Sequence, residues 1–162
     1  MVEYENNGMK VCASISSAVS KFLTEAGGEI QAQTVRNSRT DTGQTKGSYQ
    51  YKVIEESNGG TVFIGSDYEN AIWEEYGTGE YALKGGRKGG YWVYVKGSSG
   101  KSRSSKTYTL KEAKKIVAIL RAKGIPASYS CGKRPNKPLF NAFNSKKGML
   151  ERRLNEVLKS KK

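Results

Sequence analysis

Three glutamates surround a glycine turn in the segment EEYGTGEY, residues 74–81: Glu74, Glu75 and Glu80. Two carboxylates can act as a general acid and a general base when a cleft holds them on opposite sides of a substrate. Glu74 and Glu75 are adjacent, and adjacent residues of a helix point in different directions, so they do not form such a pair. We therefore expect an acidic helix end that faces solvent or another subunit.

The other residue types also argue against catalysis. The chain has 162 residues and no histidine, which excludes Ser-His-Asp and Cys-His nucleophile systems and HExxH zinc sites. GSSGKS (97–102) ends like a phosphate-binding loop, but it has two residues between its glycines where the Walker motif needs four. Cys12 and Cys131 lack a paired spacing, so we interpret them as reduced and structural. We expect no enzyme activity, no cofactor and no metal site.

Positive charge is concentrated in one block. The chain has a net charge of +13, and residues 84–137 hold fifteen Lys and Arg residues and one acid, Glu112. Such segregation indicates a surface for nucleic acid or for an acidic partner. Aromatic residues interleave with the block, as in proteins that bind single strands, yet no named nucleic-acid signature is present. The predicted basic patch consists of Lys84, Arg87, Lys88, Lys101, Arg103 and Lys106.

Apolar spacing predicts the first elements of the chain. Residues 10–36 have the three-and-four spacing of an amphipathic helix, which Gly27-Gly28 should weaken. SYQYKVIE (48–55) and TVFIG (61–65) flank the turn signal SNGG and predict an antiparallel hairpin. Residues 91–96, YWVYVK, are typical of a strand because they are aromatic and β-branched.

Two capping-box patterns predict helix starts. Ser66 and Glu69 should open a short helix over about 67–76, and Gly77 should end it in the left-handed conformation. Thr109 and Glu112 should open a second helix that ends at Gly124. Its inward residues are predicted to be Leu110, Ala113, Ile116, Val117 and Leu120.

The end of the chain predicts a short strand and a long helix. Residues 125–130 follow the second capped helix as a strand candidate, and the prolines of GKRPNKP (132–138) are well placed to precede a helix. That helix should cover about 138–160. Its apolar residues are Phe140, Phe143, Leu150, Leu154, Val157 and Leu158. Helices and strands in this order, without a βαβ repeat, predict the α+β class.

Three segments together resemble a known family. They are RTDTG (39–43) followed by Ser48, VFIG (62–65) followed by EYGTG (75–79), and KPLFNA (137–142). In this order they resemble the phage neck proteins that join head to tail, also called minor capsid, head–tail connector or tail-completion proteins. Such proteins also occur in prophages and tail-like bacteriocins. The motif residues are Thr42, Gly43, Ser48, Gly65, Tyr76, Gly77, Thr78, Gly79, Pro138 and Phe140.

The resemblance implies a structural role in a particle. The length of the chain predicts one α+β domain over 1–162, and residues 97–131 depart from the family's pattern as a basic loop-plus-helix insertion. It implies a homo-oligomeric ring of six or twelve copies that contacts head-completion and tail-terminator or tail-tube proteins, with DNA in the channel as a further candidate and no membrane. The location would be a virion or tail-like particle assembled in the bacterial cytoplasm.

A ring of this kind joins one surface of each subunit to a different surface of the next. The basic patch is one candidate surface. The other is an acidic patch made of Asp67, Glu69, Glu74, Glu75 and Glu80. The alternative is a basic nucleic-acid-binding module that uses residues 84–137.

Overall fold

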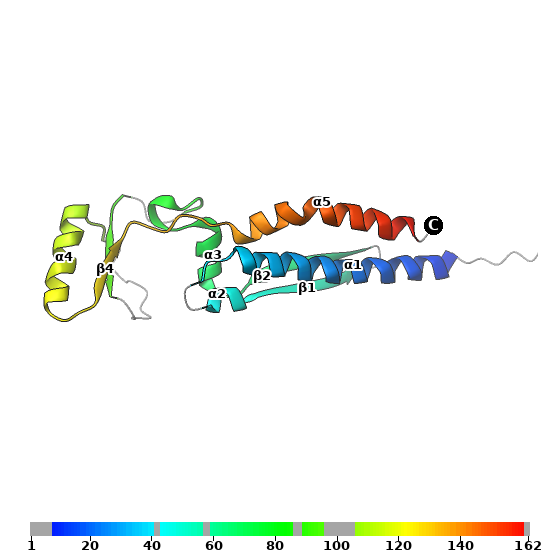
Figure 1. Cartoon of the computed structure of the whole chain (residues 1–162), viewed down its shortest axis with the longest axis horizontal. Coiled ribbons are helices and arrows are strands. Elements are labelled where there is room, and N and C mark those ends of the chain that lie inside the picture. Colours follow the sequence, from blue (N-terminus) through cyan, green and yellow to red (C-terminus); the bar gives the residue numbers. More distant parts are fainter. Residues whose placement is uncertain (1–7, 41–42, 57–58, 86–88, 96–105, 161–162) are drawn as a thin grey trace, which may run out of the picture. The chain divides into compact units, whose positions relative to one another are not determined.

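The computed structural model describes residues 8–40, 43–56, 59–85, 89–95 and 106–160 (Figure 1). The fold is α+β, with long N- and C-terminal helices and two small antiparallel sheets. The chain divides into two compact units. The terminal unit is Met1–Ala71 with Lys137–Lys162, and the central unit is Ile72–Asn136. The central unit thus begins upstream of the insertion expected at 97–131.

Two antiparallel helices form the frame of the terminal unit. They are α1 (Gly8–Asn37) and α5 (Pro138–Lys159), which lie side by side in Figure 1. The side-chain amide of Asn37 donates a hydrogen bond to the backbone carbonyl of Pro138 at 3.2 Å, so the end of α1 lies beside the start of α5. The core is small and is made of Ala26, Ile30, Ala142 and Leu150, with Phe22, Ile64, Leu139 and Met149 packed against it.

The antiparallel hairpin that the sequence predicted is present, and it lies on α1. Strand β1 (Tyr49–Glu56) pairs with β2 (Gly59–Ser66) in a register that runs from Tyr49 opposite Ser66 to Glu56 opposite Gly59. Tyr51 contacts α1, and alternation along a strand therefore puts its even-numbered neighbours on the other face. This outer face is formed by Gln50, Lys52, Ile54 and Glu56 of β1 with Thr61 and Phe63 of β2.

The first capping-box prediction is wrong in detail. After α2 (Gln44–Gly47), the next helix is α3 (Glu69–Tyr76), which begins three residues beyond Ser66. Ser66 is therefore outside the N-cap position. Its hydroxyl accepts a hydrogen bond from the Tyr68 amide at 3.0 Å and lies 2.6 Å from the hydroxyl of Ser48, so it links a strand end to a turn.

The central unit is built on its own two-stranded sheet. Strand β3 (Trp92–Val95) pairs antiparallel with β4 (Ala127–Ser130), α4 (Leu110–Ala122) packs on both strands, and a 3-10 turn, η1, covers Gly79–Tyr81. The predicted capping box of α4 is confirmed: the Glu112 carboxylate accepts from the Thr109 amide at 2.8 Å, and the Thr109 hydroxyl accepts in return.

Three apolar residues, Leu110 of α4 and Phe140 and Phe143 of α5, are more exposed than their spacing predicted. Leu110 is 39% exposed, because it occupies the first position of α4, while Ala113 and Val117 supply the buried face. Helix α5 begins at Pro138 as expected, but Phe140 and Phe143 are 56% and 48% exposed. The small Ala142, which is fully buried, makes the close contact in their place. Within the described residues, no helix is long and apolar enough to cross a membrane.

Candidate functional site

The segment EEYGTGEY is one half of a backbone clasp. Its partner is CGKRPN (131–136), and we call the pair of segments 74–80 and 131–136 the YGTG clasp. The Thr78 amide donates to the carbonyl of Lys133 at 2.9 Å, and the Glu80 amide donates to that of Cys131 at 2.8 Å. The Asn136 amide donates to the carbonyl of Glu74 at 2.8 Å. The clasp therefore joins the beginning of the central unit to its end.

The glycines of the clasp are required by close packing. Gly77 has φ 73° and its amide bonds the Trp73 carbonyl at 3.0 Å, so it ends α3 as predicted. A Cβ on Gly79 would lie 2.2 Å from the carbonyl oxygen of Cys131, and one on Gly132 would lie 2.1 Å from that of Thr78. No side chain fits between the two segments at these positions.

Glu74 is buried in the clasp, which corrects its expected place in an exposed acidic patch. It is 2% exposed, and its Oε1 forms an ion pair with the Lys133 ammonium. Its Oε2 is buried without a hydrogen-bond partner among the described residues. The physical reason is that the paired segment 131–136 covers this side of α3. Glu74 therefore has a structural position.

The remaining acidic residues have different surroundings. Glu80 is exposed, and its Oε1 accepts from the amides of Gly89 and Gly90, the second at 3.1 Å. Glu75 is half-buried. Asp67 and Glu69 are exposed and belong to the terminal unit. The predicted acidic patch is thus divided between the two units, with two exposed members in the terminal unit.

The described part of the basic patch is exposed and contacts aromatic rings. The Lys84 Nζ lies 5.1 Å from the ring centre of Tyr76, and the Lys106 Nζ lies 5.6 Å from that of Tyr108, both in cation–π range. The predicted residues Arg87, Lys88, Lys101 and Arg103 lie outside the described residues.

Three further lysines were missing from the predicted patch. Lys111, Lys114 and Lys115 are exposed on α4, and they share the central unit with Lys84 and Lys106. The charge count of 84–137 already contained them. The predicted patch consists of residues outside the helices, whereas these three lysines lie on the polar side of an amphipathic helix, and that polar side is the signal that locates them.

A tyrosine and a cysteine pack beside the clasp. The rings of Tyr91 and Tyr129 meet edge to face with their centres 5.8 Å apart. Electrostatic repulsion from the neighbouring Cys131 sulfur raises the pKa of Tyr91, and burial and a hydrogen bond with Cys131 raise this pKa further. Cys12 and Cys131 are both free thiols. These aromatic contacts stabilise the sheet end that carries the clasp.

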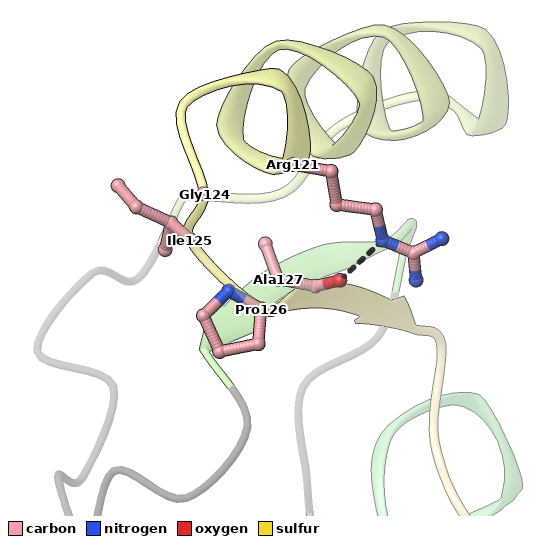
Figure 2. A pocket seen from close by; sticks show the side chains of 5 residues that line it. All are labelled: Arg121, Gly124, Ile125, Pro126 and Ala127. Carbon is pink, nitrogen blue, oxygen red and sulfur yellow. Dashed lines mark hydrogen bonds between the residues drawn. The ribbon is translucent and has the colours of Figure 1, made fainter.

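A hollow of about 310 Å³ lies where α4 turns into β4, and Figure 2 shows the residues that line it. Its lining is Arg121, Gly124, Ile125, Pro126 and Ala127. The Arg121 Nε donates to the Ala127 carbonyl at 2.9 Å, so this cation is engaged by the fold (Figure 2). None of the other lining residues places a carboxylate or a nucleophile beside the Arg121 guanidinium. Across the described part of the chain, no three His, Cys, Asp or Glu residues gather as a metal site.

Several motif residues of the terminal unit lie in turns or at the start of a helix. Gly43 has φ 82° at the start of α2, and the Ser48 hydroxyl donates to the Thr45 carbonyl at 2.9 Å. Pro138 is fully buried as the first residue of α5. Gly65 is half-buried in β2, and the ring of the exposed Phe140 lies 5.6 Å from the Lys137 Nζ. Thr42 lies outside the described residues.

No protein-family model matches this chain, and comparisons with curated proteins and with solved structures found no match either.

Proposed function

We propose that this chain is a structural subunit of the neck of a tailed phage or phage-tail-like particle, where it forms a ring that joins or completes the tail at its head-proximal end. One observation carries the proposal. The residues that resemble the neck family serve backbone geometry: Gly43 opens α2, Gly77 ends α3, Gly79 allows the clasp and Pro138 begins α5. Residues that serve the backbone in this way agree with a subunit that acts by assembling.

The polar groups of the clasp support the same proposal. Glu74 and Lys133 neutralise each other, and Glu80 holds the amides of the following loop. These carboxylates are thus engaged by their own chain rather than arranged around a substrate. In a non-enzymatic role these carboxylates need no function beyond holding the fold of their own chain.

In the proposed ring, acidic residues of one subunit meet basic residues of the next. The exposed acids Asp67 and Glu69 replace Glu74 as the centre of the acidic surface. Lys84, Lys106 and the lysines of α4 provide the basic surface. Opposite charges on two different surfaces favour a head-to-tail contact, which closes into a ring when the rotation allows it. The further partners would be the adjacent head-completion and tail-terminator or tail-tube proteins.

Light scattering on the purified chain, at low and moderate salt, tests the proposal. We expect a discrete ring-sized mass that short duplex DNA does not change. Asp67→Lys with Glu69→Lys should abolish it, because the acidic surface is reversed. The matched control is Glu151→Lys with Glu156→Lys, which makes the same charge change on exposed positions of α5. An Asp67/Glu69 variant that assembles like the wild type would contradict the proposal.

A second candidate function is nucleic-acid binding by the central unit. Residues 72–136 carry fourteen Lys and Arg residues against four acids, and Tyr94 is 40% exposed in the same unit. Binding to phosphates should then weaken with salt, with a log–log slope of roughly 0.9 per neutralised phosphate. Lys111→Glu with Lys114→Glu should reduce both affinity and slope. A monomer that binds DNA in this manner would favour the second candidate over the ring.

A further inference from the structure

We propose that the outer edge of β1 pairs with β1 of a second copy of this chain, antiparallel and centred on Ile54. The inference goes beyond the neck proposal and does not depend on it. It concerns only the hairpin of the terminal unit, which the structure describes except for residues 57–58.

Strand β1 has an open edge. The sheet of β1 and β2 has two strands, so within the described residues each strand has a ladder partner on one edge alone. Strand β1 is eight residues long and contains no proline or glycine. A long edge strand of this kind is a template for pairing with another chain, and proteins usually shorten or bend such edges.

The outer face next to that edge carries exposed apolar residues and two oppositely charged residues. Ile54 is 40% exposed and Phe63 is 57% exposed, although both stand in the middle of a strand. Lys52 and Glu56 flank Ile54 on the same face and are exposed. Neither of them makes an ion pair with another residue in the described ranges.

The residues of this outer face are complementary to those of a second copy. A two-fold antiparallel pair centred on Ile54 places Ile54 opposite Ile54 of the second copy. It also places Lys52 opposite Glu56 of the second copy, and symmetry repeats this pair on the other side. Directly opposite residues of neighbouring strands lie close enough for opposite charges to attract, so the contact gains two cross-strand ion pairs.

Other registers are less favourable. The side-chain period of a strand is two, so a slip by one residue would put outer-face residues against inner-face residues of the second copy. Centring the pair on Lys52 sets Lys52 against itself, and centring it on Glu55 sets Glu55 against itself. Centring it on Val53 puts Lys52 opposite Ile54 and leaves the charge unmatched. Only the register on Ile54 combines like apolar residues with opposite charges.

A charge exchange tests the contact. Sedimentation velocity over a concentration series should give a dimer for the chain that carries Asp67→Lys with Glu69→Lys, in which the ring contact is removed, and the strand variants are made in this background. Lys52→Glu faces Glu56 of the second copy and should weaken dimerisation by roughly tenfold, because two attractive pairs become repulsive. The double variant Lys52→Glu with Glu56→Lys restores the pairs in reversed order and should recover the dimer. Lys159→Glu, at an exposed position of α5, is the control for a charge reversal outside the strand. A double variant that fails to recover would overturn the proposal.

A cross-link tests the register. In a Cys12→Ser, Cys131→Ser background, Ile54→Cys should form a disulfide between two copies under mild oxidation, because opposite residues of an antiparallel pair can approach within disulfide range. Gln50→Cys lies on the same face but far from its symmetry mate, so it should stay monomeric on a non-reducing gel. Equal cross-linking at both positions, or at neither, would overturn the proposal. The ring is judged by the mass of the wild type, and the edge by this cross-link and by the strand variants in the ring-deficient background, so the two proposals fail separately.

Discussion

Gly27 of α1 lies against the ring of Tyr51 in β1, so close that a Cβ at this position would be 2.5 Å from the Tyr51 Cδ2. From the sequence, Gly27-Gly28 was expected to weaken α1. In the structure α1 continues through both glycines, and the first of them allows the hairpin to approach the helix. A Cβ at the neighbouring Gly28 would reach the same ring at 4.0 Å, which is ordinary contact.

This difference predicts opposite effects of two similar substitutions. Gly27→Ala should lower the free energy of unfolding by about 1–3 kcal/mol, because the ring must move from a packed position. Gly28→Ala should raise it by up to about 1 kcal/mol, because alanine is the better helix former. Urea unfolding followed by circular dichroism measures both. Destabilisation of equal size in the two variants would argue against the close contact.

The clasp predicts that its glycines cannot be replaced. Gly79→Ala should cost more stability than Gly85→Ala, although φ is 59° and 61° at the two positions. Both carry the left-handed penalty of about 1–2 kcal/mol, but only the Cβ at Gly79 meets the Cys131 carbonyl, and nothing lies within 4 Å of the one at Gly85. Hydrogen exchange of the Thr78 and Glu80 amides should rise in the first variant alone. Similar exchange in both would contradict the clasp.

The buried carboxylate of Glu74 predicts an asymmetric response. Lys133→Met leaves it without its cation and should cost about 1–3 kcal/mol of unfolding free energy. Glu74→Met combined with Lys133→Met should recover most of this loss, because a buried ion pair adds little over apolar residues of similar volume. Lys114→Met, at an exposed position of α4, is the control and should stay within about 0.5 kcal/mol of the wild type. Additive losses in the double variant would contradict the pairing.

The contact between α1 and α5 predicts a pH effect. Lys146 donates to Glu29 at 3.0 Å, and Arg153 approaches it at 3.4 Å. The hydrogen bond and charge of Lys146, followed by the charges of Arg153 and Arg36, lower the pKa of Glu29 from 4.5. A lowered folded pKa means that this stabilisation is present above about pH 4.5 and is lost as the pH falls through the lowered value.

Urea unfolding at a series of acidic pH values measures this loss. Glu29→Gln should lose less stability than the wild type as the pH falls from about 6 to about 3, because the titrating group is absent. Lys146→Met should flatten the same part of the curve, since it removes the main cause of the lowered pKa. A Glu29→Gln variant with the wild-type dependence would show that another carboxylate controls the acid limb.

The local sequence predicted most elements, and it did so where the cause is local. The spacing of α1, the alternation of the hairpin and the Thr109–Glu112 box each depend on residues within one or two turns of one another. Ser66 lies outside the cap position, and its hydroxyl contacts that of Ser48, the residue that follows α2. The structural role of a side chain that also has a distant hydrogen-bond partner cannot be predicted from the neighbouring residues of the sequence alone.

Sequence alone therefore determined the α+β class, the helix ends at Gly77 and Gly124 and the concentration of positive charge in 84–137. The tertiary structure decided that Glu74 is buried against Lys133 and that Phe140 is exposed while Ala142 is buried. The physical reason is distance along the chain. Periodicity indicates that a helix has an apolar face, but which residues are covered depends on a segment more than fifty residues away.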